Sequence, residues 1–299
     1  MQLLTSVRWY LDTDGSHYTQ YDPSTVDILL GEAAALMRAL GFAARHVTLI
    51  GGIVPTLLVP ELDPGLPPHV GTADLDLCLS VAILAGDTAE YERLDTCLRR
   101  AGFQPSEQSW RWKGGSHIPV VVEFFCPAGI GRVPGRAFRP SATDNPRARR
   151  NLGSKLSALT LTTGALIGKD VQEVTREVTL PDGKGRLTVQ LRVTGPTAYL
   201  AAKADALQNR DKPKDAYDII WLLDAWPGGP RSLARVVRAQ PISSDPLFGT
   251  TLSVLEDQFG DQDRAGAIAY ARFLSSDEDP ALLAQHAAGA VTELLRHVR

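Results

Sequence analysis

Three acidic residues of this 299-residue chain stand in segments whose patterns are typical of β-strands. Asp74 and Asp76 belong to residues 74–79, where polar and apolar residues alternate before an apolar end. Successive side chains of a strand point to opposite faces, so both carboxylates are expected on one face, about 6.5 Å apart along the backbone. Such a pair can hold Mg²⁺, which prefers oxygen ligands and is commonly bound by one or two carboxylates plus substrate phosphates. Glu123, in the apolar segment 120–125, is placed to complete a two-metal site.

A glycine pair precedes these acids. Gly51 and Gly52 follow the β-branched segment 47–50, and Pro55 lies near the first turn of an expected helix. Glycines leave room for a phosphate at a helix N-terminus, where amide donors and the helix dipole favour an anion. Each signal alone has a more ordinary explanation, namely a turn, a solvated Asp-x-Asp pair or an exposed edge-strand acid. Their order along the chain favours a nucleotide-binding site.

A second group of charged residues lies on two expected helices of the C-terminal part. Lys203 and Arg210 are seven residues apart and share a helix face, and Asp215 and Asp218 share a face of the next helix. Cations that face an acid pair are explained either by a salt-bridge network between neighbouring helices or by a site that binds an anion. The residues alone leave both interpretations open.

The elements that must position these residues form an α/β pattern. Ser24 and Asp27 mark the start of a helix that ends at Gly41, and a loop rich in proline and glycine follows over residues 60–71. A helix over 90–100, the strands around 110–112 and 120–125, and a hairpin about Pro181-Asp182-Gly183 complete this part. Six helices are expected after Pro196, at about 197–209, 213–225, 230–238, 246–258, 264–274 and 280–297.

The sequence therefore predicts an α/β N-terminal core, a mixed sheet with flanking helices, over residues 1–195, and a mostly α-helical domain over 196–299. A basic connector is expected at about 127–155. This segment contains one acid, Asp144. Its basic residues are Arg132, Arg136, Arg139, Arg147, Arg149, Arg150 and Lys155. With Lys212 and Lys214 they could form a phosphate-binding rim, or they are solvated and pair with acids such as Asp261 and Asp263.

Composition excludes several classes of function. The chain has 31 Lys and Arg residues against 34 Asp and Glu, so a net charge of −3 provides no overall field that attracts nucleic acid or membranes. Three widely spaced cysteines argue against a disulfide scaffold and suit a reducing cytosol. The sequence shows neither a signal peptide nor a membrane span, so we expect a cytoplasmic protein with no membrane partner. The six histidines lack metal-ligand spacing, which disfavours zinc chemistry.

Taken together, these motifs resemble the nucleotidyltransferase superfamily related to DNA polymerase β, and more closely the AbiEii-type toxins of type IV toxin–antitoxin systems. That superfamily has a glycine pair at a helix start, an Asp-x-Asp on the next strand and a third acid on a later strand. The AbiEii-type branch adds a Lys-x-x-Ala-Leu helix and a basic block followed by Lys-Asp-x-x-Asp. The matching residues span about 46–226 and are Gly51-Gly52, Asp74-Leu75-Asp76, Glu123, Lys203 to Leu207, Arg210 to Lys212, and Lys214 to Ile219.

Two positions depart from the branch. It often carries an arginine four residues before the first metal-binding aspartate, where this chain has Val70. The nearest polar candidates are His69 and Thr72, and Thr72 is included here among the expected nucleotide-binding residues. The third acid of the branch is commonly aspartate, whereas Glu123 is one methylene longer.

The resemblance implies transfer of a nucleoside monophosphate from a nucleoside triphosphate to a hydroxyl, with release of pyrophosphate. It implies Mg²⁺ or Mn²⁺ on Asp74 and Asp76, with Glu123 as a further ligand or as the base. Residues expected to contact the nucleotide are Gly51, Gly52, Thr72, Lys203 and Arg210, with Asp215 or Asp218 positioning Lys203 or the incoming group.

The acceptor that the resemblance implies is the 3′ end of tRNA, whose modification blocks translation, and a cognate antitoxin is the expected partner. Two alternatives stay open. The acceptor could be a small hydroxylated molecule such as an antibiotic, which acidic residues around the acceptor cleft would favour. A catalytically silent relative that only binds would instead have Asp74 and Asp76 pointing apart or blocked by neighbouring side chains.

Overall fold

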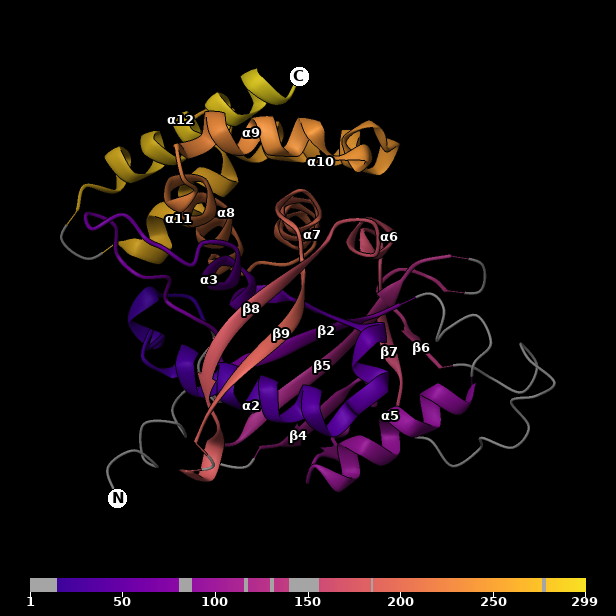
Figure 1. Ribbon diagram of the computed structural model, residues 1–299. Coiled ribbons are helices and arrows are strands. Elements are labelled where there is room, and N and C mark those ends of the chain that lie inside the picture. The colour runs from indigo at the N-terminus through magenta and orange to yellow at the C-terminus, as the bar shows by residue number, and fades with distance from the viewer. Residues whose placement is uncertain are drawn as a thin grey trace. The chain divides into compact units, whose positions relative to one another are not determined.

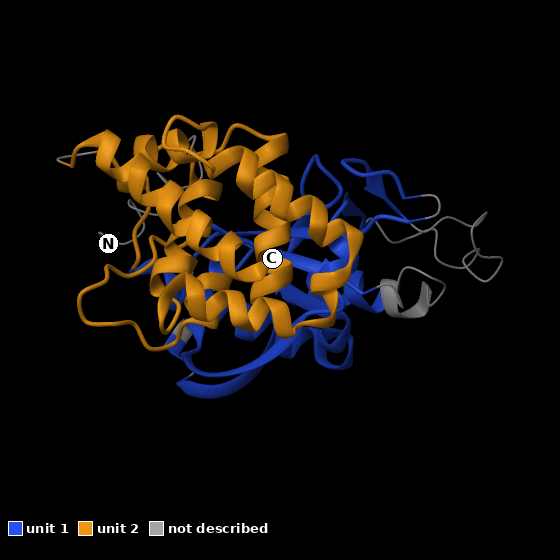
Figure 2. Cartoon of the chain, turned by 90° about the horizontal axis from the view of Figure 1, so that it is seen from above, with its two compact units in different colours: residues 1–7, 24–53, 72–194 blue, residues 8–23, 54–71, 195–299 orange. Residues whose placement is uncertain are grey.

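The computed structural model describes residues 15–80, 88–115, 118–129, 132–139, 156–183, 185–275 and 278–299 (Figure 1). Over these residues the protein is α/β with a mixed sheet, which confirms that part of the predicted fold. The chain divides into two compact units (Figure 2). Unit 1 takes its described residues from 24–53 and 72–194, and unit 2 from the segment that ends at Pro23, from 54–71 and from 195–299. Of the expected basic connector, Asp144, Arg147, Arg149, Arg150 and Lys155 lie outside the described residues.

The sheet belongs to unit 1. Its described strands are β1 Val47–Ile50, β2 Asp74–Leu79, β3 Gln104–Pro105, β4 Arg111–Gly114, β5 Val120–Pro127, β6 Ala137–Phe138, β7 Ala158–Leu161, β8 Val171–Thr179 and β9 Arg186–Thr194. Their order is β3-β4-β5-β2-β1-β9-β8, and β7 pairs with both β5 and β6. β2 runs antiparallel to β1 and parallel to β5, so the predicted acid-bearing strands are direct neighbours. The predicted hairpin is the antiparallel pair β8–β9.

One face of the two central strands is a hydrophobic core. Leu75 and Leu77 of β2 and Val122 and Phe124 of β5 are fully buried. Burial of each such side chain contributes about 1.5–3 kcal/mol. Because β-strands alternate, burial of these residues leaves the intervening positions, which include the three acids, on the opposite face.

Helix α2, Thr25–Leu40, packs against β8 and against α5, Thr88–Arg100. Ser24 occupies the expected N-cap, but its side chain makes no capping hydrogen bond. Gly41, with φ of 55°, ends the helix as expected. Gly31 allows close packing, because a Cβ at this position would lie 2.3 Å from the Thr179 carbonyl oxygen of β8.

Unit 2 is built mostly from helices, and all six helices expected after Pro196 are present. They are α7 Pro196–Asn209, α8 Lys214–Ala225, α9 Gly229–Ala239, α10 Pro246–Phe259, α11 Ala265–Leu274 and α12 Pro280–Val298. Proline opens α7, α10 and α12, where its missing N–H costs least. The N-cap side chains of Asp245 and Asp279 accept backbone N–H groups at the starts of α10 and α12.

Further short elements complete the two units. Unit 1 also contains the 3₁₀ helices η2 Gly41–His46, η3 Gly51–Ile53 and η5 Pro181–Gly183, with the short helix α6 Gly164–Ile167. Unit 2 also contains η1 Tyr18–Gln20, α3 Val54–Leu58 and η6 Pro241–Ser244. None of the helices in the described ranges is long and apolar enough to span a membrane.

Candidate functional site

The three predicted acids lie in one row of the unit 1 sheet. In the strand register Asp76 stands opposite Ile50 of β1 on one side and Glu123 of β5 on the other. Asp74 lies two residues earlier on β2 and therefore shares a face with Asp76. Arg111 of β4 stands opposite Glu123 in turn, so the row extends across four strands. The structure thus brings the three acids onto one half-buried face.

Gly51 forms the wall beside Asp76. Its φ of 76° lies in the left-handed region, and a Cβ built on it would be 1.9 Å from Asp76 Oδ2. Only glycine therefore fits here without displacing the carboxylate. The helix expected to start at the glycine pair is a 3₁₀ turn, η3, which α3 follows, and Gly52 is buried within that turn.

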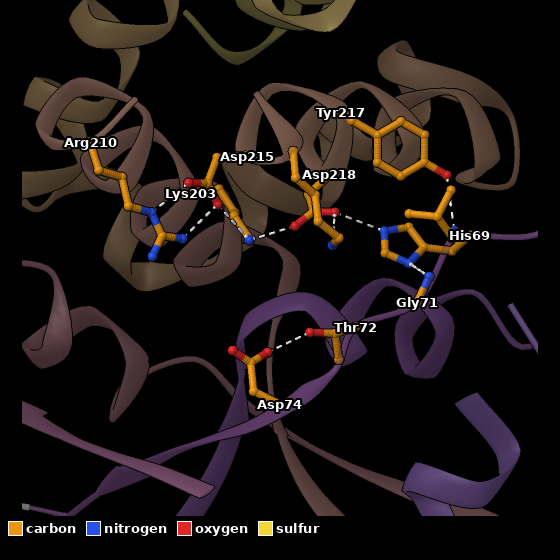
Figure 3. Close-up of polar contacts among 11 residues, drawn as sticks. His69, Gly71, Thr72, Asp74, Lys203, Arg210, Asp215, Tyr217 and Asp218 are labelled. Carbon is orange, nitrogen blue, oxygen red and sulfur yellow. Dashed lines mark hydrogen bonds and ion pairs between the residues drawn. The ribbon is translucent and has the colours of Figure 1, made fainter. Parts of the chain in front are cut away.

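Thr72 orients the first aspartate. Its hydroxyl donates a hydrogen bond of 2.6 Å to Asp74 Oδ1, which Figure 3 shows. Thr72 itself is buried, so the structure gives this residue a role in holding Asp74. Contact of Thr72 with a nucleotide stays a prediction.

Glu123 has a cationic partner that the sequence did not suggest. Arg111 Nε donates to Glu123 Oε1 at 2.7 Å, and Arg111 Nη2 contacts the same oxygen. Among the described residues, no three or more His, Cys, Asp or Glu side chains gather closely enough to hold a metal. Binding of Mg²⁺ by the pair Asp74 and Asp76, with phosphates as the remaining ligands, stays a prediction. The assignment of Glu123 as metal ligand or base stays a prediction.

The charged residues of the C-terminal part form a second cluster, inside unit 2. Lys203 Nζ lies 2.8 Å from Asp215 Oδ1 and 2.5 Å from Asp218 Oδ2 (Figure 3). Arg210 Nε lies 2.7 Å from Asp215 Oδ2, and Arg210 Nη2 donates to Oδ1 of the same carboxylate. Each of these residues was predicted, and the structure connects all four through α7, its C-cap and α8.

Two members of this cluster were not among the predicted catalytic or nucleotide-binding residues. Lys214 was a candidate for the phosphate-binding rim, but the structure buries it, which contradicts a place in an exposed rim. Lys214 Nζ lies 2.7 Å from Asp218 Oδ1, and His69 Nε2 lies 2.9 Å from the same oxygen. Asp218 thus contacts three side chains that can carry positive charge. The spacing of Lys214 and Asp218, four residues apart, could have revealed their pairing from the sequence. His69 lies 149 residues from Asp218 in a proline-rich loop, and no local signal indicates their contact.

Burial and charge together set the pKa values of this cluster. Burial alone would raise the pKa of Asp218, but Lys203 and Lys214 outweigh it and hold the pKa well below its ordinary value. Burial alone would lower the pKa of Lys203, but Asp215 and Asp218 raise it above its usual range. For Lys214 burial prevails over Asp218 and lowers the pKa. Both aspartates are therefore ionised at neutral pH.

The sequence fits no protein-family model, and no curated protein shows significant similarity to it. Membership of a nucleotidyltransferase family therefore stays a prediction from the motifs.

Proposed function

We propose that this protein is a metal-dependent nucleotidyltransferase with an α/β catalytic core and a helical C-terminal domain. The observation that carries the proposal is the pair Asp74 and Asp76 on one face of β2, with Gly51 against Asp76. Two carboxylates two residues apart on a strand suit a hard divalent ion and the phosphates bound to it. Because glycine has no side chain, the Asp76 carboxylate can lie against the backbone at Gly51.

Each residue then has a role that its surroundings support. Asp74 and Asp76 hold Mg²⁺ or Mn²⁺, which when bound neutralises charge on the phosphate oxygens. The Thr72 hydroxyl fixes the direction of Asp74. Glu123, held by Arg111, is the candidate for the group that accepts the proton of the acceptor hydroxyl or adds a ligand.

The reaction is attack of an acceptor hydroxyl oxygen on the α-phosphorus of a nucleoside triphosphate. A new phosphorus–oxygen bond forms and the bond to pyrophosphate breaks. Lys203 contributes positive charge toward the polyphosphate, and Asp215 and Asp218 hold its ammonium group in place. Arg210, with half of its side chain exposed, supplies further positive charge.

The acceptor in this proposal is the 3′ end of tRNA, and the protein is a cytoplasmic toxin neutralised by a cognate antitoxin. The described part of the basic connector supports a polyanionic acceptor. Arg136 and Arg139 are exposed there, and Arg132 stacks on Phe138 at 5.6 Å. Exposed arginines in a loop are suited to backbone phosphates.

One observation favours a second candidate, a relative that binds but does not catalyse. Arg111 neutralises the charge of Glu123, so one of the three predicted acids is already engaged. In such a protein Asp74 and Asp76 would serve binding alone, and no nucleotide would be transferred.

Incubation of the purified protein with Mg²⁺, each labelled nucleoside triphosphate and total tRNA tests the proposal. We expect label in RNA, reduced about 100-fold or more by Asp76→Ala, because loss of a preorganised electrostatic group costs several kcal/mol of barrier. The matched control is Glu177→Ala, which removes an exposed, arginine-paired acid from β8 of the same sheet.

Two results distinguish the candidates. Label in a small hydroxylated acceptor instead of RNA supports the antibiotic-modifying alternative. Absence of transfer to any acceptor supports the binding relative and contradicts the enzyme.

A further inference from the structure

His69 makes two hydrogen bonds that fix its protonation state. The backbone N–H of Gly71 donates to His69 Nδ1 at 3.0 Å, so Nδ1 must carry a lone pair (Figure 3). The remaining proton therefore resides on Nε2, which faces Asp218 Oδ1 at 2.9 Å. The imidazole is thus a neutral donor to Asp218, and it is completely buried. Burial lowers the pKa of His69 to about 4, so this form persists at neutral pH.

Two further side chains of α8 hold the same segment. The backbone N–H of Val70 donates to the hydroxyl of Tyr217 at 3.1 Å. Trp221 Nε1 donates to the carbonyl of Pro67, also at 3.1 Å. Residues 217, 218 and 221 lie on neighbouring positions of one helix, so α8 anchors residues 67–71 at three points. The chain continues from Gly71 directly to Thr72 and the aspartates of β2.

We infer that His69 is a positioning residue for nucleotide transfer, acting through Asp218. This inference rests on the proposed function. Asp218 divides its two oxygens between partners: Oδ1 contacts His69 and Lys214, and Oδ2 contacts Lys203. The imidazole donor fixes the rotation of the carboxylate, which in turn aims Oδ2 at the Lys203 ammonium. His69 touches neither nucleotide nor metal in this scheme.

A neutral donor suits this task better than a third cation. Lys203 and Lys214 already supply two positive charges to one carboxylate, and a protonated imidazole would add a third in a buried space. A protonated Nδ1 would also oppose the N–H of Gly71. The segment and the cluster are therefore compatible only with neutral His69.

The two hydrogen bonds can be separated by substitution. In His69→Gln the side-chain amide nitrogen reaches the place of Nε2 and preserves the donor to Asp218. In His69→Asn the amide oxygen replaces Nδ1 and preserves only the acceptor for Gly71. We expect the KM for the nucleoside triphosphate to rise about tenfold or more in His69→Asn, as for loss of a hydrogen bond to a charged group. In His69→Gln it stays within about threefold of the wild type.

Unit 2 offers a matched control. His286 Nε2 lies 2.8 Å from Asp224 Oδ2 in an exposed histidine–aspartate pair. His286→Asn should leave both KM and kcat unchanged. Nitrogen NMR of the His69 imidazole provides a readout independent of turnover, with the neutral Nε2–H tautomer expected at pH 7.

The outcomes separate this inference from the proposed function. An active wild type in which His69→Gln and His69→Asn have equal KM values overturns the positioning role and leaves the transferase intact. An Nδ1–H tautomer overturns it irrespective of activity. A wild type that transfers no nucleotide while showing the Nε2–H tautomer overturns the proposed function, and the role of His69 in transfer with it.

Discussion

The acid row of unit 1 and the ion cluster of unit 2 handle negative charge in opposite ways. In the row, the side chain of Glu123 is 13% exposed and its partner Arg111 is 40% exposed. In the cluster, Asp218 has no exposed side-chain surface and contacts three partners that hold it ionised. A carboxylate near water can acquire a cation at little cost, whereas a buried one must keep those it has. The exposure of the row is compatible with the proposed binding of an ion, whereas the cluster suits the fixing of a geometry.

Removing the charge of Asp218 is the strongest test of this difference between the row and the cluster. Asp218→Asn leaves Lys203 and Lys214 buried with half of their counter-charge, and we expect a loss of about 3–5 kcal/mol in the free energy of unfolding. Urea denaturation monitored by circular dichroism measures it. Asp224→Asn, which disrupts a more exposed pair with His286, is the control and should cost less than about 1 kcal/mol. Similar losses of stability for both variants would mean that the buried cluster stabilises the fold no more than the exposed pair of Asp224 and His286 does.

Acid titration of His69 gives the next largest effect. The pKa of His69 is about 4 in the folded chain and 6.5 in the unfolded chain, so the unfolded state binds more protons between these values. The contribution of His69 to the free energy of unfolding is therefore fully present above about pH 6.5. It decreases by about 3 kcal/mol as the pH falls toward 4.

His69→Gln removes this titration and isolates its contribution from Asp218, Lys203 and Lys214, which face the same imidazole. Between pH 7 and pH 4 the wild type should lose about 3 kcal/mol more than the variant in chemical denaturation. Parallel curves for the two proteins would show that His69 titrates alike in the folded and unfolded chain.

Gly51→Ala tests the row with a smaller expected effect. The added Cβ meets Asp76 Oδ2 and also occupies a left-handed backbone conformation, and together these should cost about 2–3 kcal/mol and most of the transfer activity. Gly135→Ala is the matched control, because Gly135 has a similar φ of 72° but open space around its Cβ position. Its cost should be about 1 kcal/mol. Equal losses of stability in the two variants would mean that Asp76 moves away from the added Cβ with no measurable loss of stability.

The sequence predicted the elements well where local chemistry determines them. The alternation of residues 74–79 identified a strand, and Ser24 and Gly41 identified the start and the end of α2. Arg111 escaped prediction because its pairing with Glu123 depends on the register of β4 against β5. The pairing of His69 with Asp218 escaped because it depends on burial and on a partner 149 residues away. Local patterns in the sequence could not predict contacts between residues that lie far apart along the chain.

Unit 2 is discontinuous along the chain, and this has a consequence for synthesis on the ribosome. Residues 54–71 are made early, yet their anchors on α8 emerge nearly 150 residues later, after the whole strand set of unit 1. Until α8 is translated, the nascent loop has no partner for His69 or for the Pro67 carbonyl, and both groups are solvated. A fragment beginning at residue 196 would accordingly lack one wall of its own core. Any attempt to express the helical part alone should carry the early loop along, joined to it by a designed linker.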